Sequence, residues 1–280
     1  MGTPIKKTRY KLLVLDIDGT LLNRNGEISE EDCRALAAVR EVGISVSLCT
    51  GRTVRSCRKI LEKLSLNGYH IFFDGALVYN PERNEEVYSR PLPPSLVREM
   101  SQAALQDGIP LDLFSVTGYF TTEETWRTRI RREFFGIEST ICDIRSLWQK
   151  EKIIKGGTVI SCAAEERNFQ AYIRRFKDTL NYTRTVTPAW PDLSFINILA
   201  PGVSKGQALE ALASHLKIRT DEVMSIGDGS NDIPLLAASG LAVAMQNAPE
   251  ELKSVADFIT ADVEQSGVAQ AIQKFLLETT

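Results

Sequence analysis

Short apolar runs alternate with amphipathic helical stretches at both ends of the chain. Toward the N-terminus, apolar runs at 12–15, 44–49 and 71–73 are separated by helical patterns that begin near Ser29 and Thr53. Toward the C-terminus we expect helix, strand, helix, strand and helix over 204–216, 223–226, 233–238, 241–244 and 267–277. Strands that alternate with helices form a parallel sheet covered on both faces. The sequence therefore predicts an α/β fold with a doubly wound, Rossmann-like parallel sheet.

The middle of the chain follows a different pattern. Between about 80 and 192, turn signals separate short strand-like pieces, with helical patterns near 95–106, 122–135 and 165–180. All three tryptophans lie in this segment. We interpret it as an inserted α+β domain. Residues 1–82 and 193–280 would then form the core domain, and residues 83–192 the inserted domain.

Composition and charge exclude several classes of protein. The net charge is only −3 over 280 residues, so no strong field attracts nucleic acid or an anionic membrane. No apolar run approaches the roughly 20 residues that span a bilayer, and the basic segment 1–11 lacks a signal-peptide cleavage pattern. The five cysteines include no C-x-x-C pair, which is typical of free thiols in a reducing compartment. We therefore expect a cytoplasmic protein without nucleic-acid or membrane partners.

Two carboxylates, two residues apart, directly follow the first apolar run. Asp16 and Asp18 belong to the segment DIDGT, in which a glycine marks a turn. Strand ends of this kind are where open α/β sheets build their sites. Two acids so close both stay ionised only when a cation or a division of roles separates them. A turn without function has a similar composition, because Asp and Gly are both favoured in turns.

Three further polar clusters each follow or precede a predicted core element. Thr50-Gly51-Arg52 offers a hydroxyl and backbone amides at a helix N-terminus, where phosphate binds readily. Lys205 lies at the start of a helix, where a cation is unfavourable unless it faces an anion. Residues 227–232, GDGSND, place two acids and an amide in a glycine turn, and such hard oxygen ligands suit Mg²⁺.

Together and in this order, the clusters resemble the motifs of haloacid dehalogenase (HAD) superfamily phosphohydrolases, specifically the Cof-type branch. The matching segments are DIDGTLL (16–22), CTGR (49–52), PGVSKG (201–206) and GDGSNDIPLL (227–236). The resemblance covers nearly the full length, and the inserted domain lies where this branch carries its cap. Four ordered motifs are far more specific than any one of them alone.

The resemblance implies a role for each matching residue. Asp16 would be the nucleophile that forms an aspartyl-phosphate, and Asp18 the general acid and then the general base. Thr50 would bind the phosphoryl oxygens, and Lys205 would neutralise the charge that develops there. The implied ligands of Mg²⁺ are Asp16, Asp18 (through its backbone carbonyl), Asp228 and Asp232, the last of which could instead orient the lysine. The implied phosphate-binding residues are Thr50, Gly51, Arg52, Lys205 and Asn231.

The implied activity is Mg²⁺-dependent hydrolysis of phosphate monoesters of small metabolites. A sugar phosphate or a phosphorylated cofactor would be the substrate, and the cap would recognise its leaving group. We expect Trp126 or Trp190 to face that substrate, and we expect a monomer. A sugar phosphomutase of the same superfamily stays open as an alternative. Asp74 stands where relatives usually carry Asn, and we expect its carboxylate to satisfy a turn rather than to tune substrate charge.

Two rival functions can be formulated from the same residues. The segment 49–56, CTGRTVRS, fits the C-x5-R-S loop of cysteine-dependent phosphatases, with Cys49 as nucleophile. Against this, Cys49 ends an apolar strand, where a buried thiol is inert. The segment 126–132, WRTRIRR, could belong to an RNA-binding module. The neighbouring glutamates favour a solvated cap helix instead, from which one arginine could still face the substrate.

Overall fold

The structure, a computed structural model, describes residues 9–187 and 190–277. Its core lobe contains a five-stranded parallel sheet in the order β14-β13-β12-β1-β2. These strands are β1 (Leu12–Leu15), β2 (Ser45–Leu48), β12 (Val223–Gly227), β13 (Leu241–Ala244) and β14 (Phe258–Ile259). The chain winds from β1 toward β2 on one side and toward β12 on the other. This confirms the predicted doubly wound sheet and places its switch point at the carboxyl end of β1.

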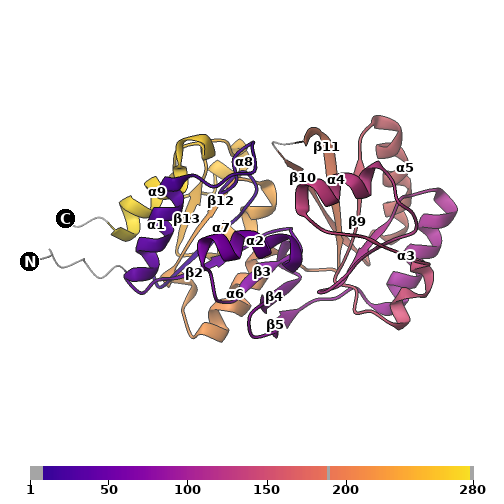
Figure 1. Ribbon diagram of the computed structural model, residues 1–280, viewed down its shortest axis with the longest axis horizontal. Helices are drawn as coiled ribbons and strands as arrows, with labels where there is room; N and C mark the ends of the chain where they lie inside the picture. The colour runs from indigo at the N-terminus through magenta and orange to yellow at the C-terminus, as the bar shows by residue number, and fades with distance from the viewer. Residues whose placement is uncertain (1–8, 188–189, 278–280) are drawn as a thin grey trace, which may run out of the picture.

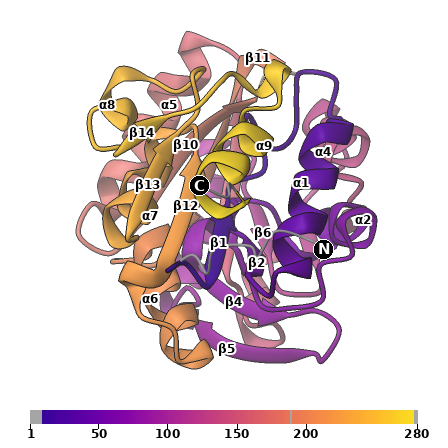
Figure 2. The ribbon, with the colours of Figure 1, turned by 90° about the vertical axis from the view of Figure 1, so that its left-hand side faces the viewer.

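Helices cover both faces of this sheet (Figure 2). One face packs against α1 (Glu30–Glu41), α2 (Val54–Leu64) and α9 (Gly267–Ile272), the other against α6 (Lys205–Leu216) and α7 (Ile233–Ala238). The short α8 (Glu250–Lys253) lies between β13 and β14 in the chain. Leu13 and Leu15 belong to the first packed face and Leu12 and Val14 to the second, because successive side chains of a strand alternate. All four are buried, which explains why this strand is apolar throughout.

The third apolar run forms β3 (His70–Phe72), but it joins the main sheet less closely than we expected. It pairs antiparallel with β4 (Leu77–Asn80), which pairs with β5 (Glu85–Ser89) in a separate three-stranded sheet. A single parallel bridge between Cys49 and Ile71 keeps β3 beside β2. This small sheet packs against α6 and therefore extends the core lobe.

Residues 94–199 build a second lobe, at the right of Figure 1, around a six-stranded sheet in the order β10-β11-β9-β6-β7-β8. Its strands are β6 (Asp112–Phe114), β7 (Tyr119–Thr121), β8 (Thr140–Ile141), β9 (Lys155–Ile160), β10 (Asn181–Thr187) and β11 (Trp190–Leu199). Helices α3 (Pro94–Asp107) and α5 (Ala163–Ile173) pack together on one face, and α4 (Trp126–Phe135) packs on the other. The lobe is α+β, as predicted.

The sheets divide the chain elsewhere than at the predicted borders of 82/83 and 192/193. Residues 85–89 pair with the core hairpin. At the other border, β11 continues to Leu199 and pairs with β9 and β10. Strand β10 and the start of β11 were not predicted, because both are largely exposed and carry polar residues without a regular apolar run.

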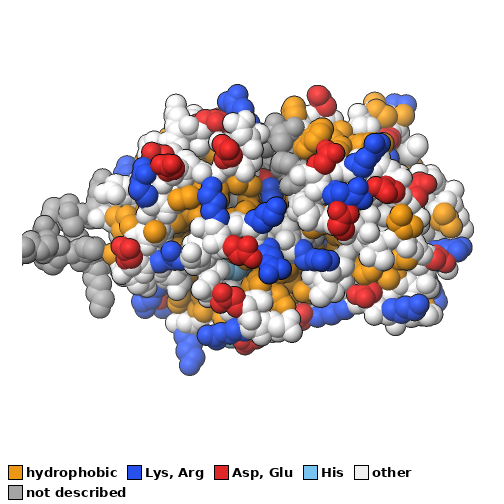
Figure 3. Space-filling model, in the orientation of Figure 1, with side chains coloured by type: hydrophobic (Ala, Val, Ile, Leu, Met, Phe, Trp, Pro, Cys, Tyr) orange, Lys and Arg blue, Asp and Glu red, His pale blue; other side chains and the backbone are white. Residues whose placement is uncertain are grey.

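The molecular surface carries charges of both signs. On the face shown in Figure 3, acidic and basic side chains are interspersed over both lobes. Within residues 9–187 and 190–277, no helix is long and apolar enough to cross a membrane. The surface in view thus offers no single field of positive charge of the kind that attracts a polyanion.

A buried histidine gives the core lobe a testable pH dependence. His70 is 0% exposed, and its Nδ1 accepts a hydrogen bond from the backbone N–H of Leu48 at 3.1 Å. Burial lowers the pKa of His70 from 6.5 to about 4. Between these values the unfolded chain binds a proton and the folded chain does not. We therefore expect acidification across this window to lower the free energy of unfolding by up to about 3 kcal/mol.

Denaturant unfolding at a series of pH values from 7 to 4 measures this effect. Other groups titrate in the same range, so the quantity of interest is the difference between the wild type and His70→Gln. The exposed His215, the other histidine of the chain, provides a matched control in His215→Gln. We expect the control to keep the wild-type pH dependence and His70→Gln to lose part of it. Identical curves for wild type and His70→Gln would contradict the prediction.

Candidate active site

The four sequence clusters meet at one edge of the core sheet, facing the second lobe. Because β12, β1 and β2 are adjacent and parallel, the turns that follow them lie side by side. The N-terminus of α6 brings the remaining cluster to the same place. A cavity of about 270 Å³ opens there, lined by Asp16, Asp18, Thr50 and Asp228 of the core and by side chains of the second lobe.

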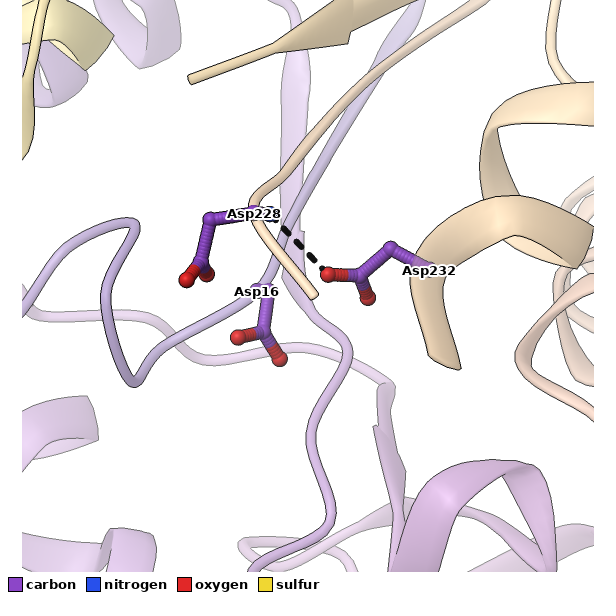
Figure 4. A group of neighbouring side chains, drawn as sticks. All are labelled: Asp16, Asp228 and Asp232. Atoms are coloured by element: carbon purple, nitrogen blue, oxygen red, sulfur yellow. Dashed lines mark hydrogen bonds between the residues drawn. The ribbon is translucent and has the colours of Figure 1, made fainter. Parts of the chain in front are cut away.

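Three aspartates form an acidic cluster beside this cavity (Figure 4). Asp16 follows β1, and Asp228 and Asp232 belong to the turn between β12 and α7. One carboxylate oxygen from each residue lies within 4.8 Å of the others. Asp232 Oδ2 accepts hydrogen bonds from the backbone N–H groups of Asp228 at 3.1 Å and Gly229 at 2.9 Å. The turn is therefore fixed by one of its own acids.

Lys205 links two members of this cluster. It is the first residue of α6 and is only 1% exposed. Its Nζ donates to Asp16 Oδ1 at 2.7 Å and to Asp232 Oδ1 at 2.5 Å. We expected an anion to face this lysine, because a cation at a helix N-terminus is otherwise unfavourable. Two carboxylates of the site occupy that position.

The charges of the cluster do not balance. Three carboxylates surround one ammonium group, which leaves two negative charges uncompensated when all are ionised. Burial raises the pKa of Asp16 to about 7 although Lys205 opposes it, and burial raises the pKa of Asp228 well above its usual range. Burial alone would lower the pKa of Lys205, but Asp16 and Asp232 raise it well above its ordinary value. An excess of two negative charges among hard oxygen donors fits a divalent cation.

Asp16 and Asp228 are the members best placed to hold such an ion. Both line the cavity, and Thr20 Oγ1 donates to Asp228 Oδ1 at 2.8 Å. Asp232 already accepts hydrogen bonds at both carboxylate oxygens, so its geometry suits an orienting role. Gly19 has a φ of +88°, and a Cβ atom there would lie 2.2 Å from Asp228 Oδ2, so only glycine allows this close approach.

Asp18 stands apart from the acidic cluster. Its carboxylate accepts hydrogen bonds from Arg52 Nε at 2.8 Å and Arg52 Nη2 at 2.6 Å in a largely buried, bidentate ion pair. The guanidinium also lies 5.1 Å from the centroid of the Phe135 ring. We expected Arg52 to bind phosphate. Its side chain instead binds that of Asp18, because opposite charges attract strongly where water is excluded. The backbone carbonyl of Asp18, which is the expected metal ligand, takes no part in this ion pair.

The turn after β2 forms as predicted. Thr50 lines the cavity, and its Oγ1 accepts a hydrogen bond from the backbone N–H of Arg52 at 3.1 Å. The Gly51 carbonyl accepts a hydrogen bond at 2.8 Å from Lys155 Nζ, which belongs to the second lobe. The predicted phosphate loop thus contacts the second lobe directly.

Asn231 and Asp74 bind each other next to this loop. Asn231 Nδ2 donates to Asp74 Oδ1 at 2.9 Å, and Thr183 Oγ1 of β10 donates to Asp74 Oδ2 at 3.2 Å. We expected the Asp74 carboxylate to satisfy its own turn. That expectation was wrong: the backbone takes the left-handed conformation with φ 56°, and the carboxylate accepts hydrogen bonds from two other elements. Asp74 therefore connects the turn between β12 and α7, which contains Asn231, to the second lobe.

The second lobe forms the other wall of the cavity. Its contributions include Phe114, Arg131 and Lys155. Neither Trp126 nor Trp190 is among the lining residues, so the expectation that they face a substrate was wrong. Both pack in the apolar cluster between α4 and the sheet. The arginine of α4 that does reach the cavity is Arg131.

Cys49 does not have the properties of a catalytic thiol. Its side chain is 0% exposed and does not line the cavity. Burial raises the pKa of Cys49 well above its ordinary value. A nucleophilic cysteine needs a stabilised and accessible thiolate. The structure therefore contradicts the alternative of a cysteine-dependent phosphatase.

The arginines of α4 do not form an exposed basic face either. Arg127, Arg131 and Arg132 are paired with carboxylates of the second lobe. The first two of these are also buried. RNA binding depends on basic side chains that can reach phosphates. Arg129 is the exposed arginine of this helix, and one such side chain does not form the basic patch that RNA recognition needs.

Sequence reasoning missed the contributions of Thr20 and Lys155 and the partners of Asp74. Thr20 belongs to the first motif, so its position offered a local signal. Lys155 bonds to a residue 104 positions away, and Asp74 to one 157 positions away. No local pattern could reveal either contact.

Comparison with known proteins defines the class. A family model described as haloacid dehalogenase-like hydrolase matches residues 13–272. The Bacillus subtilis (strain 168) protein YxeH is 31% identical over 274 residues, which is 96% of this chain and 99% of that protein. A solved haloacid dehalogenase-like hydrolase from Bacteroides thetaiotaomicron superposes with a TM-score of 0.83 at 25% identity, covering 95% of this chain and 99% of that one. The chain belongs to the haloacid dehalogenase-like hydrolases, as its motifs indicated.

Two further relatives differ in how much of their own length this chain covers. 5-amino-6-(5-phospho-D-ribitylamino)uracil phosphatase YcsE of Bacillus subtilis (strain 168) is 28% identical over 276 residues, which is 95% of this chain and 96% of that protein. The chloroplastic endoribonuclease YBEY of Arabidopsis thaliana is 30% identical over 288 residues, or 98% of this chain. This chain spans only 48% of the Arabidopsis protein. The family of the chain, and the phosphatases that it matches over nearly their whole length, place it among the phosphoric monoester hydrolases.

Proposed function

We propose that this chain is a Mg²⁺-dependent phosphatase that hydrolyses phosphate monoesters of small metabolites through an aspartyl-phosphate on Asp16. The observation that carries the proposal is the setting of Asp16. It lines the cavity, is 7% exposed, bonds to Lys205, and shares an acidic cluster with Asp228 and Asp232. A carboxylate in this setting has both a fixed orientation and access to a ligand.

Asp16 would act as the nucleophile. Lys205 holds Oδ1, which leaves Oδ2 to attack phosphorus in line with the ester oxygen. A bond forms between this oxygen and phosphorus while the bond from phosphorus to the leaving oxygen breaks. Lys205 and the Thr50 hydroxyl would offset the negative charge on the phosphoryl oxygens.

Asp18 would exchange protons with the leaving group and with water. In each turnover Asp18 would begin with its carboxyl group protonated and give this proton to the leaving oxygen. The resulting carboxylate would then take a proton back from the water that attacks the aspartyl-phosphate. The hydrogen bonds from Arg52 hold the Asp18 side chain at the cavity wall, two residues from the nucleophile. Arg52 would therefore act as a positioning residue.

The acidic cluster would hold Mg²⁺. Asp16, Asp228 and the backbone carbonyl of Asp18 are the proposed ligands, with Asp232 orienting Lys205. The fit rests on the two uncompensated negative charges and on donors that are all oxygen, since Mg²⁺ typically takes one or two carboxylates and keeps several waters. When bound, the ion would supply positive charge that offsets the repulsion between a carboxylate and a phosphate dianion.

The second lobe would act as a cap that selects the substrate. The cavity of about 270 Å³ lies just below the range of roughly 300–1,000 Å³ for small-molecule sites, which favours a small substrate. The phosphatase YcsE, by its name, acts on a small phosphorylated metabolite, which supports the same substrate class here. Sugar phosphates and phosphorylated cofactors both belong to this class.

Metal removal tests the proposal. Dialysis against EDTA should abolish release of inorganic phosphate from 4-nitrophenyl phosphate, and MgCl₂ should restore it. Calorimetry should show Mg²⁺ binding to the wild type and not to Asp228→Asn, whereas Asp143→Asn, which changes an exposed acid of the second lobe, should bind normally. Activity that survives EDTA would refute the proposal. A rearranged sugar phosphate in place of inorganic phosphate would identify the phosphomutase alternative.

A further inference from the structure

Lys155 is a buried cation at the junction of the two lobes. It begins β9 and is 4% exposed. Its Nζ donates to the Gly51 carbonyl at 2.8 Å and to Asn197 Oδ1 at 2.8 Å. An ammonium group has three N–H donors, so one remains beyond these two bonds. Because Lys155 also lines the cavity, that donor is available to a ligand.

The charge of Lys155 has no direct counter-ion. Within the described ranges, no carboxylate lies at ion-pair distance from its Nζ. Asp112 is paired with Arg131, and Asp74 acts only from farther away. Burial lowers the pKa of Lys155 to about 8, and Asp74 opposes only part of this effect. A buried ammonium group of this kind is stabilised when an anion binds beside it.

The position of Lys155 indicates which part of a substrate it would meet. Its Nζ lies 5.2 Å from the centroid of the Phe114 ring, and the Arg131 guanidinium lies 5.1 Å from the same centroid. Asp112 balances the charge of Arg131, and Glu166 balances that of Arg184, so Lys155 supplies the net positive charge of this wall. The core wall of the same cavity carries Asp16. A phosphate ester whose phosphorus meets Asp16 therefore directs its leaving group toward the wall that carries Lys155.

We propose that Lys155 is a specificity-determining residue that binds a second anionic group, a carboxylate or a second phosphate, on the leaving-group portion of the substrate. The inference rests on the proposed phosphatase function and adds a substrate class to it: small phosphate monoesters with a second negative charge. The bound anion takes the third N–H of the ammonium group. Gly51 and Asn197 hold the other two and keep Nζ at the cavity.

Matched pairs of phosphate esters test this proposal. The first two pairs differ only in a carboxylate: 3-phosphoglycerate against glycerol 3-phosphate, and 6-phosphogluconate against glucitol 6-phosphate. A third pair, fructose 1,6-bisphosphate against fructose 6-phosphate, tests a second phosphate. 4-Nitrophenyl phosphate serves as a reference without a second anion. The variants are Lys155→Gln, the charge-conserving Lys155→Arg, and Lys150→Gln as a control at an exposed lysine of the same lobe.

In the wild type we expect kcat/KM to favour the anionic member of at least one pair by about 10-fold to 100-fold, the range for a hydrogen bond to a charged group. Lys155→Gln should bring that ratio close to one. Loss of its hydrogen bond to Gly51 should lower kcat/KM for every ester, 4-nitrophenyl phosphate included, by a common factor that cancels in the ratio. Lys155→Arg should keep part of the preference, and Lys150→Gln all of it. If the kcat/KM ratio of a carboxylate pair changes in Lys155→Gln, the second anion is a carboxylate. If the ratio of the fructose pair changes, it is a phosphate.

Two results would overturn the inference. One is a wild type without preference in any pair, which decides the matter even if Lys155→Gln fails to fold. The other is an equal loss by Lys155→Gln on every ester including 4-nitrophenyl phosphate, because Lys155 would then only join the lobes. A wild type that hydrolyses no ester in the presence of Mg²⁺ would refute the proposed function itself.

Discussion

Asp16→Asn is expected to lose phosphatase activity by at least about 10⁴-fold, the scale on which nucleophile removal acts in other hydrolases. An amide is a poor nucleophile and a weaker ligand for a hard cation. The variant should still fold, because Lys205 keeps its ion pair with the fully buried Asp232. Phosphate release from 4-nitrophenyl phosphate measures the loss, and circular dichroism checks the fold. Mass spectrometry of acid-quenched enzyme should find a phosphorylated species only in the wild type.

Cys49→Ser is the matched control for this experiment. It changes the fully buried thiol that the rival sequence interpretation made the nucleophile. The variant should keep most of its activity while losing about 1–3 kcal/mol of stability, since its hydroxyl is buried in an apolar strand end. Iodoacetamide should leave the wild type active. The opposite pattern, with an active Asp16→Asn and a dead Cys49→Ser, would disprove the aspartate mechanism.

Asp18→Asn is expected to lower turnover by about 10² or more, because it removes the proposed acid and base. An isosteric amide in a loop would by itself be expected to disturb folding little. The structure changes that expectation, because the amide leaves the buried Arg52 guanidinium without its bidentate partner. Breaking a buried ion pair from one side costs about 3–5 kcal/mol. We therefore expect a lower melting temperature as well as slow turnover.

Rapid quench of Asp18→Asn with 4-nitrophenyl phosphate separates the two proton transfers. Nitrophenolate leaves without a proton, so the aspartyl-phosphate should form and then accumulate, because the base that activates water is missing. A burst of about one equivalent of nitrophenolate per enzyme is the expected signature. Asp143→Asn, which breaks an exposed ion pair with Arg145, should behave like the wild type. Near-normal turnover by Asp18→Asn would exclude the proposed role.

The sequence by itself determined the core architecture and the place of the site. The strand Leu12–Leu15 is buried on both faces, and a continuous apolar run is typical of a strand in that environment. Motifs at the ends of parallel strands must meet, because those ends share one edge of the sheet. The inward-facing Lys205 could be inferred for a similar reason, since the helix dipole makes an unpaired cation at that position unfavourable. The family followed from the order of the motifs.

Only the tertiary structure decided how the site residues pair and where the lobes divide. The ion pair between Asp18 and Arg52 occupies the guanidinium that we expected to bind phosphate, and it joins positions 34 residues apart. Asp74 and Lys155 meet partners that lie 157 and 104 residues away. Local sequence patterns predict which residues are buried and where turns occur, because both leave a signature in residues that are close in the chain. A charge buried between two lobes takes whichever partner the fold brings within reach, and that depends on the packing of segments that are distant in sequence.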